Sequence, residues 1–387
     1  MKIAYFSDSY LPYTSGVVTS MTTFAHGLEQ RGHDIYVYAP SYPDTPDDPN
    51  DRVVRIPSLP FPAYNGLRMA IPHPFVDYDP LEDVDIIHAH SCFAMGLTGL
   101  VKAKNKGAAL VLTVHSIYED YFSYYPVAPH LLKNITREFT AHFCKASQCV
   151  IAPSHYVLKR LEELGVTTRI EVIPTGVNLD LYQPVDRETW RIRHGLDPAK
   201  RVLLYVGRLA KEKNISLIIQ AAAKVMSLDE NVVLVIAGDG PDRGHLEQEA
   251  DELGVGDRVL FLGMLDTQAV VAAYQAAEIF VFASTMETQG LTILEAMAGS
   301  LPVVAVDAPA TRELVTEGQA GYLTPANVEP MAARITHLLT HPDLIVAMGE
   351  QARLVAEQYS GEKMVERLEK VYRSLIAERA VSSALSD

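Results

Sequence analysis

The chain has 387 residues, more than one ordinary hydrophobic core accommodates, which predicts two domains. Hydrophobic residues make up 48% and charged residues 21%, as in a globular protein, and the net charge of −15 argues against nonspecific binding to nucleic acid. The three cysteines, Cys92, Cys144 and Cys149, are odd in number and form no C-x-x-C pair, which argues against disulfides and structural zinc and favours a reducing compartment.

The first half of the chain alternates predicted strands and helices. Residues 1–8 form a short apolar run that turns polar, which is typical of a strand and not of a signal peptide. A predicted helix follows over 17–30, and further strands are predicted over 34–39, 83–88, 109–114 and 149–152. This rhythm predicts a parallel sheet covered by helices. No run reaches the roughly 18 apolar residues of a membrane-spanning helix, so we expect a cytoplasmic protein.

The second half repeats the pattern. Strands are predicted over 201–206, 232–237, 259–262, 279–283 and 302–306. Pro and Gly cluster over 172–178, where the periodicity lapses, as expected of a linker. A long helix is predicted over 361–379, with a tail, 380–387, that we expect to fray. The chain is therefore predicted to be α/β, with two doubly wound domains over 1–172 and 180–360.

Two residues of the first half follow predicted strands at the sheet edge where ligands of such folds bind. Gly16 opens the first predicted helix, where its backbone could lie against a phosphate or a sugar, although glycine also serves in plain turns. His115 follows the strand over 109–114 and enters a polar, aromatic loop. That position favours a functional histidine over a core one.

The corresponding strand ends of the second half carry charge. Arg208 and Lys213 flank a turn and could neutralise a diphosphate, with a rigid donor fork and a mobile point charge; the alternative is a pair of solvated cations. Asp239, in a Gly-Asp-Gly-Pro loop, could border a nucleotide or belong to a plain turn. Gly263 and Met264 offer backbone groups and an apolar wall that would suit a base.

Two glutamates flank the last of these strand ends. Glu287 lies in the loop after the strand over 279–283, and Glu295 lies more than one turn into a predicted helix that starts near Leu291. Gly290 between them allows close approach of a ligand, and the first amides of the helix form an anion site. Two carboxylates for hydroxyl groups and a helix end for phosphate suit a nucleotide sugar.

No motif demands a metal. Asp85, His88 and His90 resemble a ligand trio in composition only, because we expect the imidazoles of His88 and His90 to point to opposite faces of an extended segment. A Walker P-loop, a dinucleotide-binding G-x-G-x-x-G after the first strand and a G-x-S-x-G nucleophile elbow are all absent from the sequence.

In combination, these positions resemble the GT4 family of retaining GT-B glycosyltransferases. The resemblance covers nearly the whole chain and rests on the order and spacing of Gly16, His115, the pair Arg208 and Lys213, and Glu287-x7-Glu295. It implies two Rossmann-like domains that face an interdomain cleft. The first would bind the acceptor, the second would bind the nucleotide sugar, and the terminal helix would pack back towards the first.

The resemblance also implies a role for each residue. Arg208 and Lys213 would hold the donor diphosphate, Glu287 the sugar hydroxyls and Glu295 the ribose, and His115 would lie near the C6 hydroxyl of the sugar. Three more donor contacts would come from Gly16 and from the amides of Gly290 and Leu291. Such enzymes retain the anomeric configuration and need no metal or other cofactor, because cations and helix dipoles neutralise the leaving group.

A detail of the second loop narrows the resemblance. Gln289 stands before Gly290, where many GT4 members have Phe or Leu, and with the segment 115–121 this is similar to bacterial diacylglycerol α-glucosyltransferases. That implies glucose transfer from UDP-glucose to a diacylglycerol. The alternatives are another acceptor (a sugar, a phosphoinositide or a metabolite), another donor such as GDP-mannose, or a noncatalytic module that binds nucleotide sugars.

A lipid acceptor requires a membrane-facing surface, for which the first half offers two candidates. Residues 101–160 hold 8 Lys and Arg against 3 Asp and Glu, which is either a solvated face or a patch for an anionic membrane. Within them, 128–145 predicts a basic amphipathic helix with Lys133 and Arg137, or a core helix with a solvated back. The second candidate is the Pro-broken segment 58–71, with Phe61, Tyr64, Leu67 and Arg68. We therefore expect peripheral association with the inner face of the cell membrane; the oligomeric state stays open.

Overall fold

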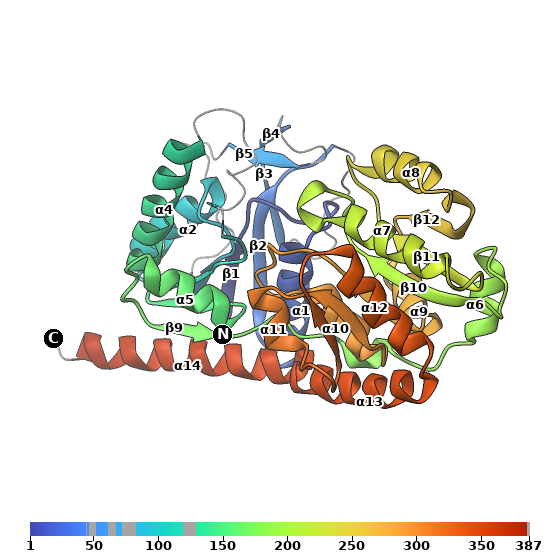
Figure 1. The fold of residues 1–387 in the computed structure, drawn as a ribbon. Coiled ribbons are helices and arrows are strands. Elements are labelled where there is room, and N and C mark those ends of the chain that lie inside the picture. The colour runs from blue at the N-terminus through green and yellow to red at the C-terminus, as the bar shows by residue number, and fades with distance from the viewer. Residues whose placement is uncertain are drawn as a thin grey trace. The chain divides into compact units, whose positions relative to one another are not determined.

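The computed structural model describes residues 1–43, 45, 52–60, 67–71, 83–117, 119 and 129–384, without the side chains of 129–132 and 382–384. Contacts divide the chain into two compact units (Figure 1). Unit 1 comprises Met1–Gly176 and Gly361–Asp387, and unit 2 comprises Val177–Ser360. The first boundary lies inside the stretch 173–179 that separates the two predicted domains.

Unit 1 is built on a seven-stranded parallel sheet in the order β3-β2-β1-β6-β7-β8-β9. Its strands are β1 (Lys2–Phe6), β2 (Asp34–Pro40), β3 (Val53–Ile56), β6 (Ile86–Ala89), β7 (Ala109–Thr113), β8 (Cys149–Ala152) and β9 (Ile170–Val172). A small antiparallel hairpin pairs β4 (Ser58–Pro60) with β5 (Arg68–Ala70). The chain leaves β1 for β2 on one side and returns to β6 on the other, which places a topological switch point between β1 and β6.

Helices cover both faces of this sheet, so its strands are apolar on both sides. They are α1 (Gly16–Gln30), α2 (Ala94–Lys106), α4 (Pro129–Ala146), α5 (His155–Glu163) and α14 (Gly361–Ala384). In β1, Ile3 and Tyr5 pack into the core that contains the apolar side chains of α1 and α14. Ala4 and Phe6 pack into the core that contains those of α2, α4 and α5. Alternate residues of one strand therefore serve two separate cores.

The terminal helix α14 belongs to unit 1 although it follows unit 2 in the chain. It packs against α1, and Glu369 on it forms ion pairs with Arg31, His33 and Arg373 at 2.6 to 3.1 Å. Burial opposes ionisation of this carboxyl, but hydrogen bonds from Arg373 and His33 lower the pKa of Glu369 to about 2. The helix continues to Ala384, beyond its predicted end at residue 379, and the predicted fraying of the tail stays a prediction.

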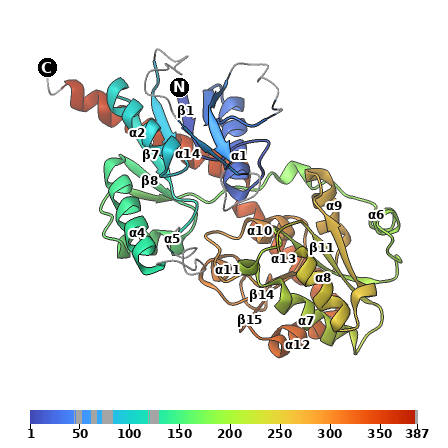
Figure 2. The same cartoon turned by 90° about the horizontal axis from the view of Figure 1, so that it is seen from above.

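Unit 2 is built on a six-stranded parallel sheet in the order β12-β11-β10-β13-β14-β15. Its strands are β10 (Arg201–Val206), β11 (Val232–Ala237), β12 (Val259–Gly263), β13 (Ile279–Phe282), β14 (Val303–Val306) and β15 (Gly321–Thr324). Its helices are α6 (Arg187–Arg193), α7 (Ile215–Met226), α8 (Arg243–Glu252), α9 (Thr267–Ala276), α10 (Leu291–Ala298), α11 (Pro309–Leu314), α12 (Val328–Leu339) and α13 (Pro342–Gln358). Of these, α7 and α12 lie side by side (Figure 2). The switch point lies between β10 and β13.

The predicted α/β class with two doubly wound parallel sheets is confirmed. Every predicted strand is present within three residues of its predicted start, the largest difference being β6, which begins at Ile86 and not at 83. The short strands β3, β9 and β15 and the hairpin β4–β5 were not predicted. Within the described residues, no helix combines the length and apolar character needed to cross a bilayer.

Candidate active site

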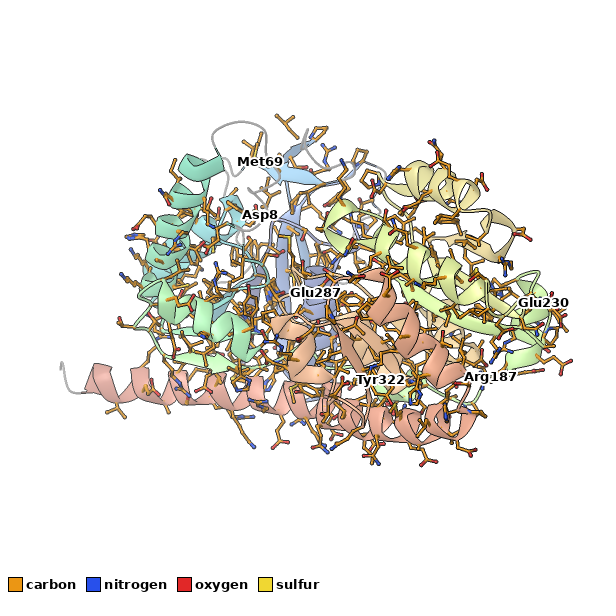
Figure 3. The ribbon with its side chains drawn as sticks, in the orientation of Figure 1. Asp8, Met69, Arg187, Glu230, Glu287 and Tyr322 are labelled. Carbon is orange, nitrogen blue, oxygen red and sulfur yellow. The ribbon has the colours of Figure 1, made fainter. Side chains whose placement is uncertain are left out.

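Glu287 and Lys213 form an ion pair at the switch point of unit 2. Lys213 ends a short 3-10 turn (Lys211–Lys213) after β10, and Glu287, labelled in Figure 3, lies in the loop between β13 and α10. The Lys213 Nζ donates to Glu287 Oε1 at 2.5 Å, and both side chains are half-buried. The structure thus brings together two predicted site residues that are 74 positions apart in the sequence.

Buried hydroxyls hold the loop that carries Arg208 and Lys213. The Tyr205 hydroxyl donates to the Arg208 carbonyl, and the Ser284 hydroxyl donates to the Glu212 carbonyl, both at 3.2 Å. The side chain of Arg208 is exposed. Sequence reasoning did not single out Tyr205 or Ser284, because Tyr205 lies in an apolar run, Ser284 directly follows one, and the partner of each is a backbone carbonyl.

Glycine is required where this loop passes its neighbour. Gly238 follows β11 with φ of 142°, and a Cβ on it would lie 1.9 Å from the Gly207 carbonyl oxygen. No side chain fits in that space. A residue with a side chain at position 238 would therefore force the ends of β10 and β11 apart.

The loop after β13 enters α10 through a glycine. Gly290 has φ of 83° and is the N-cap of α10, and as a glycine it has no side chain with which to cap the helix. The backbone amides of Leu291 and its successor therefore lie at a helix N-terminus with the positive end of the helix dipole, as predicted for an anion site. Whether a phosphate or a sugar occupies it stays a prediction.

Glu295 lies in the second turn of α10 and faces α9. Its Oε2 accepts a hydrogen bond from the Tyr274 hydroxyl at 2.9 Å. Burial raises the pKa of Glu295 to about 7, against the lowering effect of that hydrogen bond. A carboxyl whose pKa is raised in this way is typical of a binding or catalytic site.

The remaining donor candidates of unit 2 follow β11 and β12. The Gly238 amide donates to the Gly263 carbonyl at 2.8 Å, which ties the two strand ends together. Met264 next to it is 65% exposed, so an apolar wall is available to a ligand. Asp239 accepts from the Gly240 amide and forms an ion pair with Arg243 at 3.5 Å, so part of its capacity serves the loop itself.

In unit 1, Gly16 begins α1 directly after Ser15, whose side chain accepts from the Val18 amide. A Cβ on Gly16 would meet no atom within 4 Å, so no steric conflict inside the described chain requires glycine there. Its predicted closeness to the donor phosphates therefore stays a prediction.

Asp8, also labelled in Figure 3, is a half-buried carboxylate that sequence reasoning missed. It follows β1 at the switch point of unit 1. Its oxygens accept from the Met95 amide at 3.1 Å and from the Ser91 hydroxyl at 2.5 Å, so it caps the start of α2. Burial raises the pKa of Asp8.

His115 follows β7, is half-buried and stacks on the buried ring of His90. Its Nε2 lies 3.0 Å from His90 Nδ1, and burial lowers the pKa of His115 to about 4. The rings of His88 and His90 stack with centroids 4.2 Å apart, so the expectation that they point to opposite faces was wrong. Residues two apart on a strand share a face. Among the described residues, no group of three or more His, Cys, Asp and Glu side chains is arranged to hold a metal ion.

The structure describes some, but not all, of the residues that were predicted to contact the acceptor or the membrane. Phe61 and Tyr64 lie outside the described residues. Leu67 is half-buried, and Arg68 donates to the hydroxyl and the carbonyl of Ser58 at 2.8 and 2.7 Å, which braces the β4–β5 hairpin.

Lys133 and Arg137 are half-buried on α4. Of the predicted apolar face of this helix, Phe143 is 1% exposed but Ile135 is 56% exposed. The face is therefore buried near its C-terminal end and open to solvent nearer the start of the helix.

Comparison with known proteins identifies the family of this chain. Residues 14–181 match the family model of Glycosyltransferase Family 4, and residues 186–355 match that of Glycosyl transferases group 1. The alpha-monoglucosyldiacylglycerol synthase of Streptococcus pneumoniae is 31% identical over 351 residues, which cover 89% of this chain and 80% of that protein. The chain belongs to glycosyltransferase family 4. This glycosyltransferase is therefore a hexosyltransferase, which leaves the noncatalytic alternative without support.

Other relatives define the range of activities. The enzyme of the same name from Acholeplasma laidlawii is 29% identical to this glycosyltransferase, over 97% of this chain and 98% of that one. A GDP-mannose-dependent alpha-mannosyltransferase of Mycolicibacterium smegmatis is 29% identical over 88% of this chain and 89% of that one. Among solved structures, sucrose-phosphate synthase from Thermosynechococcus elongatus superposes with a TM-score of 0.80 at 22% identity, covering 97% and 99% of the two chains. This likeness shows the GT-B fold class.

Proposed function

We propose that this glycosyltransferase transfers glucose from UDP-glucose to a diacylglycerol-type lipid at a membrane surface, with retention of the anomeric configuration and without a divalent metal. The likeness to two alpha-monoglucosyldiacylglycerol synthases over 89% and 97% of the chain carries the donor and acceptor assignment. The pair of Lys213 and Glu287 at the switch point of unit 2 supports the placement of the donor there.

The charges around this pair suit a leaving diphosphate. When the bond between the anomeric carbon and the phosphate oxygen breaks, negative charge develops on the diphosphate, which Lys213, Arg208 and the N-terminus of α10 would stabilise. These groups would supply the positive charge that a metal ion provides in other transferases. Activity should therefore withstand EDTA.

The hydroxyl of the acceptor would attack the same face of the sugar that the diphosphate leaves, which retains the configuration. Its proton would pass to the departing phosphate oxygen, so that the products are the glycolipid and UDP. Glu287 would hold hydroxyls of the transferred sugar, Glu295 the ribose, and His115 the C6 hydroxyl. Each carboxylate accepts from hydroxyl groups, which is the chemistry these positions offer.

Unit 1 carries an exposed apolar surface that suits a membrane. Phe93, Leu97 and Val101 precede or lie on α2 at four-residue spacing, and each is more than two-fifths exposed. Helix α2 packs beside β5, whose Met69, labelled in Figure 3, is also exposed. We name this set the α2–hairpin surface; it comprises Leu59, Met69, Ile71, Phe93, Leu97 and Val101. Large exposed apolar side chains grouped in this way mark an interaction surface, and Lys104 and Lys106 in the last turn of α2 would favour anionic lipids.

The direct test is incubation of the purified protein with radiolabelled UDP-glucose and liposomes that contain diacylglycerol. We expect label in the organic phase that depends on diacylglycerol and persists in EDTA. Liposomes without diacylglycerol are the control. Absence of labelled lipid, with turnover on a soluble acceptor, would refute the lipid assignment.

A second candidate follows from the mannosyltransferase relative, because its similarity covers almost as much of the chain. In that case GDP-mannose would be the donor, and the acceptor could be another lipid, a sugar or a metabolite. Thermal-shift measurements with UDP-glucose and GDP-mannose separate the two, since a ligand at 100 times its dissociation constant stabilises the protein by about 2.7 kcal/mol.

A further inference from the structure

Four polar side chains form a buried row between the core helix α14 and His115 in unit 1. His88 Nδ1 lies 2.5 Å from the Tyr372 hydroxyl, and His88 Nε2 lies 2.7 Å from the Thr113 hydroxyl. The His88 ring stacks on the His90 ring, and His90 Nδ1 lies 3.0 Å from His115 Nε2. His88 therefore contacts residues of β7 and α14, and His90 contacts His115 directly.

The histidines of this row are neutral at physiological pH. Burial lowers the pKa of His88 and of His90 well below the ordinary value, and that of His115 to about 4. A neutral imidazole carries one proton, on one of its two nitrogens. A nitrogen pair 3.0 Å apart is therefore a hydrogen bond only if one of the facing atoms carries the proton and the other is bare.

The surroundings of His90 Nε2 indicate whether His90 Nδ1 or His115 Nε2 carries the proton. His90 Nε2 is buried and has no hydrogen-bond partner among the described residues. A proton on Nε2 would create an unpaired buried N–H group, which is rarer in proteins than an unpaired acceptor. The proton therefore belongs on Nδ1, and His90 donates to His115 Nε2. The proton of His115 must then lie on its own Nδ1.

We propose that His90 is a positioning residue that holds His115 in the Nδ1–H tautomer, so that the Nε2 lone pair of His115 is engaged by His90. This rests on the proposed function, in which His115 contacts the donor sugar. In this arrangement the nitrogen of His115 that lacks a proton faces His90, so His115 is not a general base. The hydrogen bond to His90 occupies the nitrogen that would otherwise accept a proton.

The tautomer can be read by proton–nitrogen NMR correlation of isotope-labelled histidine in the full-length, ligand-free protein, with His115→Asn to assign the ring. We expect the Nδ1–H pattern for His115. In His90→Phe, which keeps a ring but removes the donor, we expect a mixture with the Nε2–H form and a fall in kcat of about tenfold, with less change in KM. His90→Asn returns an N–H near the former Nδ1 and should restore both readouts.

His88→Phe is the matched control, because His88 is equally buried and stacks on the His90 ring, but its nitrogens contact the hydroxyls of Thr113 and Tyr372 and not His115. It should lower the melting temperature and leave the His115 tautomer unchanged. An Nε2–H pattern in the wild type, or equal tautomer changes in His88→Phe and His90→Phe, would overturn the proposal. Full activity of His115→Ala would instead refute the proposed contact of His115 with the sugar, and the tautomer result would stand independently.

Discussion

At the scale of single residues, the predicted donor site contains opposite charges that contact each other. Lys213 and Glu287 form an ion pair in which Nζ and Oε1 are 2.5 Å apart. A donor diphosphate would offer Lys213 a second anionic partner, and sugar hydroxyls would offer Glu287 new donors. The ion pair restrains both side chains at the switch point, and such restraint reduces the ordering that binding must supply.

Lys213→Ala is therefore expected to reduce turnover of UDP-glucose by about 100-fold or more, because it removes a cation from the developing charge and leaves Glu287 without its partner. Lys211→Ala is the control. It removes the same charge from the same turn, where the side chain of Lys211 is exposed. Steady-state rates with liposomes measure both, and equal effects of the two variants would show that only the local net charge matters.

Glu295 provides a prediction about pH. Its pKa is raised to about 7, so between pH 4.5 and 7 the folded state binds more protons than the unfolded state, and stability from this group falls as the pH rises. Glu295→Gln keeps an acceptor for Tyr274 and removes the charge. It should raise the melting temperature, more at pH 8 than at pH 5, by an amount that corresponds to at most roughly 3 kcal/mol.

The exposed Glu230, labelled in Figure 3, supplies the control for this experiment as Glu230→Gln. Its replacement should leave the melting temperature almost unchanged at both pH values. A melting temperature of Glu295→Gln below that of the wild type at pH 8 would mean that the carboxylate is stabilised in the folded protein, contrary to the burial argument.

At the scale of elements, α14 is attached to unit 1 through Glu369. Its pKa is lowered to about 2, so the stabilisation is complete above the ordinary glutamate pKa and is lost as the pH falls towards 2. Glu369→Gln is expected to destabilise the protein by about 2 kcal/mol at pH 7, as for loss of hydrogen bonds to a charged group. The difference from the wild type should shrink as the pH is lowered below 4.

Glu366→Gln on the same helix is the matched control, because Glu366 pairs with Lys370 on the exposed surface. Exposed pairs of this kind contribute little, so its melting temperature should stay near that of the wild type. If both variants melted alike at pH 7, the ion pairs of Glu369 would have no special role.

Sequence patterns predicted the elements that have long apolar runs, because parallel strands buried on both faces are uniformly apolar. They did not predict β3, β9 or β15, because Arg55, Glu171 and Gly321 interrupt these short apolar runs. They also could not show which site residues contact one another. Lys213 and Glu287 are 74 positions apart, and Tyr372 and His88 are 284 apart, so only the folded chain reveals these pairs.

The error on His88 and His90 had a different cause. Side chains two positions apart on a strand share a face, so the sequence already placed His88 and His90 on the same side, contrary to the expectation of opposite faces. Its correction places three histidines in one row and makes His90 a neighbour of His115. His90, which the sequence analysis set aside as a metal ligand, therefore contacts His115, a predicted site residue.

At the scale of the whole molecule, an enzyme with a lipid substrate needs a surface that meets the membrane. We expect the double variant Leu97→Asp and Val101→Asp on the α2–hairpin surface to reduce vesicle binding and activity on liposomes by about tenfold or more. Activity on a short-chain acceptor dispersed in detergent should be retained. Sedimentation with vesicles and parallel activity assays measure the two effects.

Val346→Asp on α13 is the control, since Val346 is 63% exposed in unit 2 and Val101 is 56% exposed in unit 1. It should leave both activities intact. Equal losses on liposomes and in detergent for the α2 variant would mean that the substitutions damage the fold of unit 1 and do not act through the membrane.

The most direct test of the proposed function is the structure of the glycolipid product. Purified protein, UDP-glucose and diacylglycerol liposomes in EDTA should yield a glycolipid that can be extracted and analysed by mass spectrometry and proton NMR. We expect one glucose per diacylglycerol, joined by an α-linkage that retains the configuration of the donor. A β-linked product, a mannose-containing product with GDP-mannose as the preferred donor, or no glycolipid at all would contradict it.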